Sequence, residues 1–391
     1  MKITDIKAYT VKNPIPTRGG KYFNFVKVET DCGINGWGEV YWNTYQPETF
    51  RGVVADMANK IMIGEDPHNI EKMWQKLFND QFYQHSDLSK MGVVSGLECA
   101  CWDIIGKAAD KPVYELLGGL YNDRLITYSY VYDDINAHTK DLGKVWHDPE
   151  LAAKRAMAYK ELGFTAIKLD PVPQPTHAEG KIPPWSLSLR ELNSAETIIA
   201  AVREAVGPDM DIIIGTHGQF TVGSAVSFST RMEKYHPMWF EEPLPPENSG
   251  MIKKVADSTR IPIATGERFA SKYEYVQLLK DDAVDIVQID LAGVGGLLEG
   301  KKVAGMAEAF HRSMTPHFYA GPLNLAAAIQ LGVCSPNFII QECLERMDAF
   351  HSKFLTHPFI WEDGYLIPSK EPGLGYDINE KVVEELAIDK F

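Results

Sequence analysis

The sequence of 391 residues is poor in cysteine and contains no long apolar run. Its five cysteines are scattered and odd in number, which does not indicate a disulfide framework. Cys99 and Cys101 lie two residues apart in an apolar helical stretch, so we expect buried thiols there rather than a metal site. No segment approaches the roughly 20 apolar residues that a membrane span requires. The sequence therefore predicts neither a secreted disulfide scaffold nor a membrane protein.

Positive charge is also scarce. Lys and Arg total 39 against 53 Asp and Glu, which gives a formal net charge of −14. Such a balance repels nucleic acid and anionic membranes, so we expect neither as a partner. An acidic small molecule could still bind where a metal ion or lysines supply local positive charge. The first residues alternate like a strand and lack the apolar stretch of a signal peptide, so we expect a cytoplasmic location.

The hydrophobic periodicity changes along the chain. Residues 1 to about 47 alternate like a β-meander, and residues 48–120 have helical spacing. Eight β-rich runs then alternate with amphipathic helical segments: 126–132, 166–170, 211–218, 238–243, 261–267, 284–290, 313–318 and 337–342. Eight strand–helix units predict a closed (β/α)8 TIM barrel of the α/β class. A doubly wound open sheet is the alternative, weakened because no glycine-rich fingerprint follows the first strand.

The predicted strands end in polar residues. These are Lys168, Asp170, His217, Glu241, Glu242, Glu267, Asp290, His317 and Glu342. From His217 onward, each successive strand–helix unit contributes an acid or a histidine at the same place. The sequence therefore predicts one polar rim at the C-terminal mouth of the barrel, where barrel enzymes keep their chemistry.

Converging carboxylates repel one another unless a cation or protons neutralise them. Their hard oxygen atoms favour Mg²⁺, which keeps positions open for substrate oxygens. A metal ion there could hold a substrate carboxylate and stabilise the enediolate formed when the α-proton is removed. Lys168 and His317 lie on opposite sides of the predicted mouth and could address the two faces of that carbon. Asp290, one strand before His317, is placed to hydrogen-bond the imidazole, fix its tautomer and raise its pKa.

Six motifs point to a known family. They are GWGEV (36–40), ACWDIIGKAADKPVYELLGG (100–119), WFEEPLPP (239–246), ATGER (264–268), VQIDLAGVGGLLEGKKVA (287–304) and TPHFYAGP (315–322). Together they resemble the enolase superfamily, in its mandelate racemase/muconate lactonizing branch, over nearly the whole chain. The resemblance implies an α+β capping domain formed by both termini over a modified barrel. We accordingly expect a capping domain at 1–122, a barrel at 123–355, and a C-terminal segment at 356–391 that returns to the capping domain.

The resemblance implies roles for several of the polar strand ends. Glu241 and Glu267 match metal ligands of the family. Asp290 and His317 match the Asp–His dyad of the sixth and seventh strands. Glu342 would lie near the substrate carboxylate, where the eighth strand supplies an acid.

Two positions depart from the family's pattern. Lys168 matches the first lysine of a Lys-x-Lys pair, but Asp170 replaces the second. Gly215 stands where the third strand normally supplies a metal-binding aspartate. We therefore hypothesise a ligand shift, in which Asp170 joins Glu241 and Glu267 around one Mg²⁺ per subunit and Gly215 leaves room for it.

His217 matches the histidine that related sugar-acid dehydratases place on the third strand. There it would protonate a departing β-hydroxyl. Three alternatives stay open: His217 could ligate a softer ion such as Mn²⁺ or Zn²⁺, it could be a satisfied structural histidine, or the site could have lost its metal.

These residues imply a Mg²⁺-dependent dehydratase of acid sugars, either aldonates or aldarates, of the galactonate or mannonate type. His317 would take the α-proton and His217 would assist loss of the hydroxyl. Lys168 would stabilise the carboxylate or serve as a second base. A lactone cycloisomerase, a racemase or epimerase, and a degenerate sugar-acid-binding member are the alternatives. The expected partner is a small-molecule sugar acid, and a homo-oligomer is expected because such assemblies are common on this scaffold.

Loops over the mouth are expected to select the substrate. Segments 14–24 and 41–46 of the capping domain are rich in aromatic and polar groups. The barrel adds an unusually long insertion at 171–190, where His177 and Trp185 could close over a sugar. The candidate substrate contacts are Arg18, Tyr22, Trp42 and Arg268.

Overall fold

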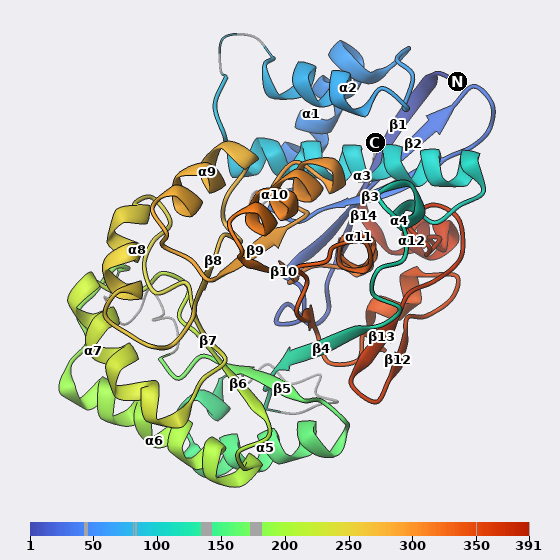
Figure 1. Cartoon of the computed structure of the whole chain (residues 1–391). Helices are drawn as coiled ribbons and strands as arrows, with labels where there is room; N and C mark the ends of the chain where they lie inside the picture. Colours follow the sequence, from blue (N-terminus) through green and yellow to red (C-terminus); the bar gives the residue numbers. More distant parts are fainter. Residues whose placement is uncertain are drawn as a thin grey trace.

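The computed structural model describes residues 1–42, 46–80, 82, 84–133, 143–172, 182–348 and 350–390. An α+β unit, formed by the two ends of the chain, lies over a barrel of parallel strands (Figure 1). The barrel helices line the outside of that barrel, and both termini lie in the α+β unit.

Eight parallel strands form the barrel, and each overlaps one of the eight expected runs. They are β4 (Leu125–Tyr130), β5 (Ala166–Leu169), β6 (Asp211–Gly215), β7 (Trp239–Glu241), β8 (Ile263–Thr265), β9 (Ile286–Asp290), β10 (Ser313–His317) and β11 (Gln341–Cys343). β4 to β10 pair in chain order, and β11 pairs with β4. A bridge between Met314 and Phe338 closes the ring. The eighth strand begins later than expected, because the residues before it make only this isolated bridge to β10.

Successive side chains of a barrel strand point alternately into the barrel and outward to the helices. One buried cluster takes a residue from nearly every strand: Tyr128, Ala166, Ile213, Trp239, Ala264, Ile286 and Ile340. The neighbouring residues Ile212 and Ile214 belong instead to the large cluster shared with the helices. This period of two is what a closed barrel with a filled interior requires.

The helices between the strands start at ordinary sequence signals. They are α5 (Pro149–Glu161), α6 (Leu189–Val206), α7 (Val222–Met232), α8 (Ser249–Ala256), α9 (Lys272–Lys280), α10 (Leu297–Ala309) and α11 (Pro322–Val333), with short turns η2 (Lys144–Trp146) and η4 (Glu233–Tyr235). Asp148 caps α5 just before Pro149, and Ser188 forms a capping box with Glu191 at α6.

The capping unit is a four-stranded antiparallel sheet with helices on it. Its strands are β1 (Ile3–Lys12), β2 (Tyr22–Thr30), β3 (Gly36–Val40) and β14 (Ala387–Lys390), in the order β14-β1-β2-β3. Its helices are α1 (Pro47–Met57), η1 (Ala58–Met62), α2 (Ile70–Phe78), α3 (Leu88–Ala109), α4 (Val113–Leu116) and α12 (Glu380–Leu386). The tail thus pairs with the start of the chain, as expected.

The rest of the tail contacts the barrel. It contains η5 (Phe350–Phe354), β12 (Ile360–Glu362) and β13 (Tyr365–Ile367). β12 and β13 form a hairpin, and β13 pairs antiparallel with β4. This extension of the barrel sheet was not expected from the sequence.

Buried carboxylates join the capping unit to the barrel. Glu39 of β3 accepts backbone N–H groups at the start of α11, and Glu98 of α3 does so at the start of α10. A helix N-terminus favours a carboxylate because its free N–H groups and its dipole point outward. β3 also packs so closely on α3 that a Cβ at Gly38 would lie 1.9 Å from the carbonyl oxygen of Gly96.

Cys99 and Cys101 are buried free thiols on α3, as expected. Among the described residues, none of the helices combines the length and the hydrophobicity that a membrane crossing needs.

Candidate active site

The structure places the polar strand ends together at the C-terminal mouth of the barrel. The buried members are Lys168, Asp170, Glu241, Glu242, Glu267, Asp290, His317 and Glu342. The His217 side chain is 29% exposed. Parallel register places Asp290 beside His317 and Gly215 beside Glu241.

His317 and Asp290 form a tight pair. Nδ1 of His317 lies 2.9 Å from Oδ2 of Asp290. The same carboxylate oxygen accepts the indole N–H of Trp42 at 2.9 Å, and Oδ1 accepts the backbone N–H of Ala292. Because a carboxylate only accepts, Nδ1 carries a proton, and Nε2 is the nitrogen that is left to take or give one. The predicted hydrogen bond between the two side chains is therefore present.

Carboxylates also face the other ring nitrogen of His317. Its Nε2 lies 3.5 Å from Oε2 of Glu267 and 3.9 Å from Oε2 of Glu342. Burial alone would lower the pKa of His317. The charge of Glu267, the hydrogen bond to Asp290 and the charge of Glu342 outweigh burial and raise this pKa to about 10.

Lys168 lies buried between two carboxylates from different strands. Its Nζ contacts Oε1 of Glu241 and lies 3.2 Å from Oε1 of Glu342. The other oxygen of Glu241 accepts the indole N–H of Trp239 at 2.9 Å. The ammonium also lies 4.6 Å from the ring centroid of Tyr130. Lys168 is thus the positive charge at the centre of the mouth.

Asp170 faces His217 and a tyrosine that the sequence analysis did not single out. Oδ2 of Asp170 lies 3.4 Å from Nδ1 of His217. The hydroxyl of Tyr130 lies 3.4 Å from Oδ1 of Asp170 and 3.2 Å from Nε2 of His217. A second Asp–His pair therefore stands across the mouth from the first, and it is looser and more exposed.

Gly215 leaves the space that Asp170 occupies. A Cβ at this position would lie 2.5 Å from Oδ1 of Asp170 and 3.1 Å from Cε of Lys168. Any larger residue would have to displace the carboxylate. The hypothesis that Gly215 makes room for Asp170 is consistent with this contact.

Glu242 and Arg268 form a pair behind the rim. The guanidinium Nε donates to Oε1 of Glu242 at 2.9 Å. Burial, with help from the charge of Glu267, raises the pKa of Glu242. Burial would also raise the pKa of Glu267, but the charges of His317 and Lys168 hold it below its usual range. Of these two neighbouring acids, Glu242 therefore keeps a proton more readily.

The mouth holds more buried carboxylates than cations. The carboxylates are those of Asp170, Glu241, Glu267, Asp290 and Glu342, beside the more readily protonated Glu242, and the cations are Lys168, Arg268 and His317, whose pKa is raised to about 10. Oε2 of Glu267 accepts no hydrogen bond from the described residues. Excess negative charge and hard oxygen donors fit a divalent cation such as Mg²⁺.

The ligand set Asp170, Glu241 and Glu267 stays a prediction. In the part of the chain that the structure describes, no three His, Cys, Asp or Glu side chains are grouped so as to hold a metal ion. The Lys168 ammonium instead takes the position against Glu241. A metal ion with these ligands would require Lys168 to move away from Glu241.

The predicted substrate contacts are already engaged with protein groups. Arg18 stacks over the Tyr132 ring, with its carbon 3.3 Å from the centroid, and pairs with Glu345 at 3.2 Å. Tyr22 begins β2 and lies beneath the Lys21 ammonium. Their role in substrate binding stays a prediction, as does that of Trp42 and Arg268 described above.

The long insertion is only partly described. Trp185 lies against Phe220, to which it is joined by a backbone bridge. This contact gives it a packing role. His177 and residues 43–45 lie outside the described residues.

Tyr130 is the site residue that sequence reasoning missed. It ends the first barrel strand and so stands on the same rim as Lys168 and His217. The run 126–132 ends in tyrosines, and a polar hydroxyl at a strand end is a signal for the same rim. An aromatic residue at a strand end is usually a core residue, whereas here its hydroxyl contacts Asp170 and His217.

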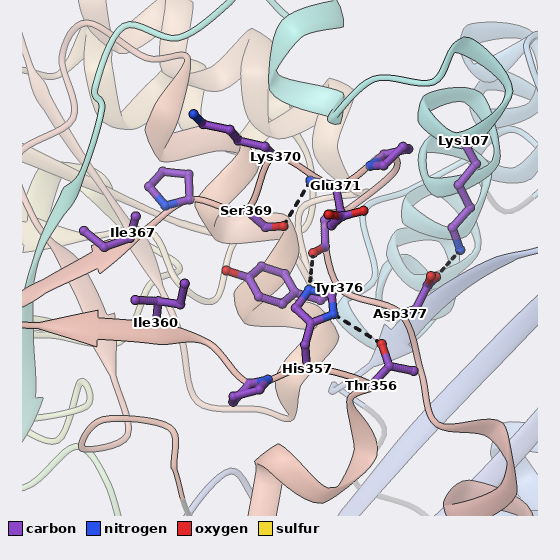
Figure 2. Close-up of a pocket in the computed structure, with 14 residues that line it drawn as sticks. Lys107, Thr356, His357, Ile360, Ile367, Ser369, Lys370, Glu371, Tyr376 and Asp377 are labelled. Carbon is purple, nitrogen blue, oxygen red and sulfur yellow. Dashed lines mark hydrogen bonds and ion pairs between the residues drawn. The ribbon is translucent and has the colours of Figure 1, made fainter.

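A cavity of about 790 Å³ lies away from this mouth, along the C-terminal segment (Figure 2). Lys107 of α3 and residues between 356 and 377 line it, and none of the predicted site residues does. Lys107 pairs with Asp377 at 2.6 Å, and His357 bonds to the carbonyl of Gly375. We assign this cavity no part in the chemistry.

Comparison with known families matches both parts of the chain. The model described as "Mandelate racemase / muconate lactonizing enzyme, N-terminal domain" matches residues 4–118. The model described as "Enolase C-terminal domain-like" matches residues 150–382.

Individual relatives match nearly end to end. The D-galactonate dehydratase of Pectobacterium atrosepticum is 32% identical, over 98% of this chain and 94% of its own length. That of Ralstonia nicotianae is 33% identical with the same coverage. A crystal structure of a candidate mandelate racemase/muconate lactonizing enzyme from Labrenzia alexandrii is 45% identical, with a TM-score of 0.92 over 99% of this chain and 100% of that chain.

Proposed function

The chain belongs to the mandelate racemase/muconate lactonizing enzyme family of the enolase superfamily, and from this premise we propose that it is an acid-sugar dehydratase, a hydro-lyase. The observation that carries the proposal is the presence of two Asp–His pairs at one barrel mouth. His317 with Asp290 can take an α-proton, and His217 with Asp170 can give a proton to the departing hydroxyl. The two D-galactonate dehydratases support dehydration of an aldonate, and an aldarate presents the same reacting atoms.

The reaction needs a base on one side and an acid on the other. Nε2 of His317 takes the proton α to the substrate carboxylate, while Asp290 holds Nδ1–H and so fixes the ring. The electron pair of that C–H bond is first held as an enediolate of the substrate carboxylate and then expels the β-hydroxyl, which leaves as water with a proton from His217. The resulting enol rearranges to a 2-keto-3-deoxy acid. Lys168 stabilises the carboxylate or serves as a second base.

The reaction needs a divalent ion, which Asp170, Glu241 and Glu267 would hold. We expect one Mg²⁺ per subunit, or Mn²⁺ in its place. When bound, a divalent ion would neutralise the carboxylates that raise the pKa of His317 and would stabilise negative charge developing on the substrate carboxylate. Oxygen ligands of this type favour Mg²⁺ over softer ions.

Racemisation or epimerisation is the second candidate. Lys168 and His317 approach Glu342 from different strands, at 3.2 Å and 3.9 Å. Two bases on opposite faces of one carbon could exchange its proton without expelling a hydroxyl. For either reaction we expect a small-molecule sugar acid as the partner, a homo-oligomer and a cytoplasmic location.

A library of acid sugars tests the proposal. The protein is incubated with Mg²⁺ and each aldonate or aldarate in deuterated buffer, and products are analysed by mass. We expect at least one substrate to lose water and give a 2-keto-3-deoxy acid. If a substrate gains deuterium at its α-carbon and no substrate loses water, the protein is instead a racemase or epimerase. No change in any member of the library would contradict both.

A further inference from the structure

Tyr130 is a buried side chain to which the proposed mechanism gives no role. It ends β4, and its residue is only 6% exposed. Its hydroxyl lies within hydrogen-bonding distance of Oδ1 of Asp170, at 3.4 Å, and of Nε2 of His217, at 3.2 Å. Its ring supports the Lys168 ammonium. The tyrosine therefore touches three groups of the site at once.

The chemistry of these groups fixes the direction of the hydrogen bonds. The Asp170 carboxylate only accepts, so the Tyr130 hydroxyl donates to it. The phenol oxygen then accepts, and the group that can donate to it is Nε2–H of His217. Nδ1 of His217 lies 3.4 Å from the second oxygen of Asp170. This Nδ1 makes no hydrogen bond to the described residues, so it is the Tyr130 hydroxyl that holds the imidazole, at Nε2, and joins it to Asp170.

The backbone conformation at His217 helps to set the orientation of its imidazole ring. His217 has a φ of 49°, in the left-handed region that residues with a Cβ seldom adopt. The next residue, Gly218, donates its N–H to the carbonyl of Glu242 at 2.7 Å, and Thr216 donates its hydroxyl to the same carbonyl at 3.0 Å. A strained backbone held from both sides projects the imidazole towards Tyr130 and Asp170 rather than into the core.

We propose that Tyr130 is a positioning residue for the dehydration step, whose hydroxyl holds the orientation of His217. This inference rests on the proposed function, because it concerns how His217 donates a proton to the departing hydroxyl. Removing the Tyr130 hydroxyl leaves His317 and Asp290 untouched, so α-proton removal should continue. Only the later expulsion of the β-hydroxyl should slow.

The test compares two rates in deuterated buffer with the substrate found in the library. One is deuterium incorporation at the α-carbon of recovered substrate, and the other is formation of the 2-keto-3-deoxy product. For Tyr130→Phe we expect product formation to fall at least about tenfold through kcat, with KM and α-exchange within about threefold of wild type. An equal fall in both rates, or no fall in product formation, would overturn the proposal.

A matched control is available two residues along the same chain. Tyr132 is equally buried, and its hydroxyl makes no hydrogen bond to the described residues. Its ring stacks with Arg18, a contact that phenylalanine keeps. Tyr132→Phe should leave both rates within about threefold of wild type, and a loss like that of Tyr130→Phe would count against a specific role for the Tyr130 hydroxyl.

A measurement without substrate separates this inference from the proposed function. Long-range ¹H–¹⁵N spectra of the histidines, with the His217 signals assigned by their absence in His217→Asn, report the hydrogen bonding of each ring nitrogen. We expect the His217 Nε2 signal to shift in Tyr130→Phe, because the contact with the phenol oxygen is lost. Unchanged His217 signals in Tyr130→Phe would overturn the positioning role even if no acid sugar is turned over. If the signals change and the library yields no product, it is the dehydratase proposal that fails.

Discussion

Among the described residues two histidines are almost completely buried, and their surroundings drive their pKa values in opposite directions. His317 is 6% exposed and His351 is 2% exposed. Burial and the charge of the nearby Arg18 lower the pKa of His351 to about 4, and its hydrogen bond to the carbonyl of Arg18 does not offset this. Around His317, the charge of Glu267 and the hydrogen bond to Asp290 outweigh burial and raise the pKa to about 10.

Burial therefore does not by itself mark a functional histidine here. His351 packs at a tilt against the ring of Phe23, a residue of the capping sheet, and stays neutral. His317 faces several carboxylates at a barrel mouth, where a proton can be exchanged with a ligand. His217 has an aspartate beside it as His317 does, and this likeness favours a role at the mouth over the structural alternative.

The largest expected effect follows from removing the mouth histidine. His317→Asn keeps a side-chain amide that can donate to Asp290 but has no basic nitrogen. We expect both α-deuterium incorporation and product formation to fall by about 10³-fold or more, the upper range of general-base contributions. His351→Gln, which leaves the mouth unchanged, should stay within about threefold of wild type in both rates. Comparable losses of rate in His317→Asn and His351→Gln would contradict the distinction between the two histidines.

The next largest expected effect is a loss of unfolding free energy at acidic pH, caused by His351. The folded-state pKa of His351, about 4, lies below the unfolded value of 6.5, so between these pH values only the unfolded chain binds the proton. The stabilisation from a neutral His351 is complete above pH 6.5 and is lost as the pH falls towards 4. We expect wild type to lose about 3 kcal/mol of unfolding free energy from this group, at 1.36 kcal/mol per unit.

Urea denaturation at pH 7 and pH 4.5 measures this loss. His351→Gln keeps a donor for the Arg18 carbonyl and should lose correspondingly less stability between the two pH values. His311→Gln, at an exposed position, should behave like wild type. If wild type and His351→Gln lose the same unfolding free energy between pH 7 and pH 4.5, the conclusion that buried His351 is neutral is wrong.

Much of the barrel could be predicted because its signals are local and repeat. Short apolar runs, each followed by a helical pattern, set the eight strands, and parallel register then places their final residues side by side. Asp290 beside His317 follows from that register alone. The polar rim was predictable for the same reason.

The contacts between the capping unit and the barrel could not be predicted in this way. Trp42 and Asp290 are 248 residues apart in sequence, and Arg18 and Glu345 are 327 apart. Both contacts depend on how two units dock, which no local periodicity encodes. Trp42 was expected to face the substrate, yet its indole holds the aspartate of the His317 pair. Tyr130 was missed because its position at a strand end equally suits a core aromatic residue.

The smallest expected effect is a change in metal affinity on replacing Asp170. It tests the same contrast between the two histidines, because carboxylates line the mouth around His317. Asp170→Asn keeps the shape of the side chain and removes one charge beside Gly215. Asp211→Asn, at the opposite end of the adjacent strand β6, is the matched control.

Calorimetric titration of the purified, chelator-treated protein with Mg²⁺ tests most directly whether the carboxylates of the mouth hold a divalent ion through Asp170. We predict one site per chain in wild type and in Asp211→Asn, and an affinity at least about tenfold weaker in Asp170→Asn, since ligand charge sets affinity for such ions. Magnesium binding that is absent from wild type, or equally tight in Asp170→Asn, would contradict this assignment.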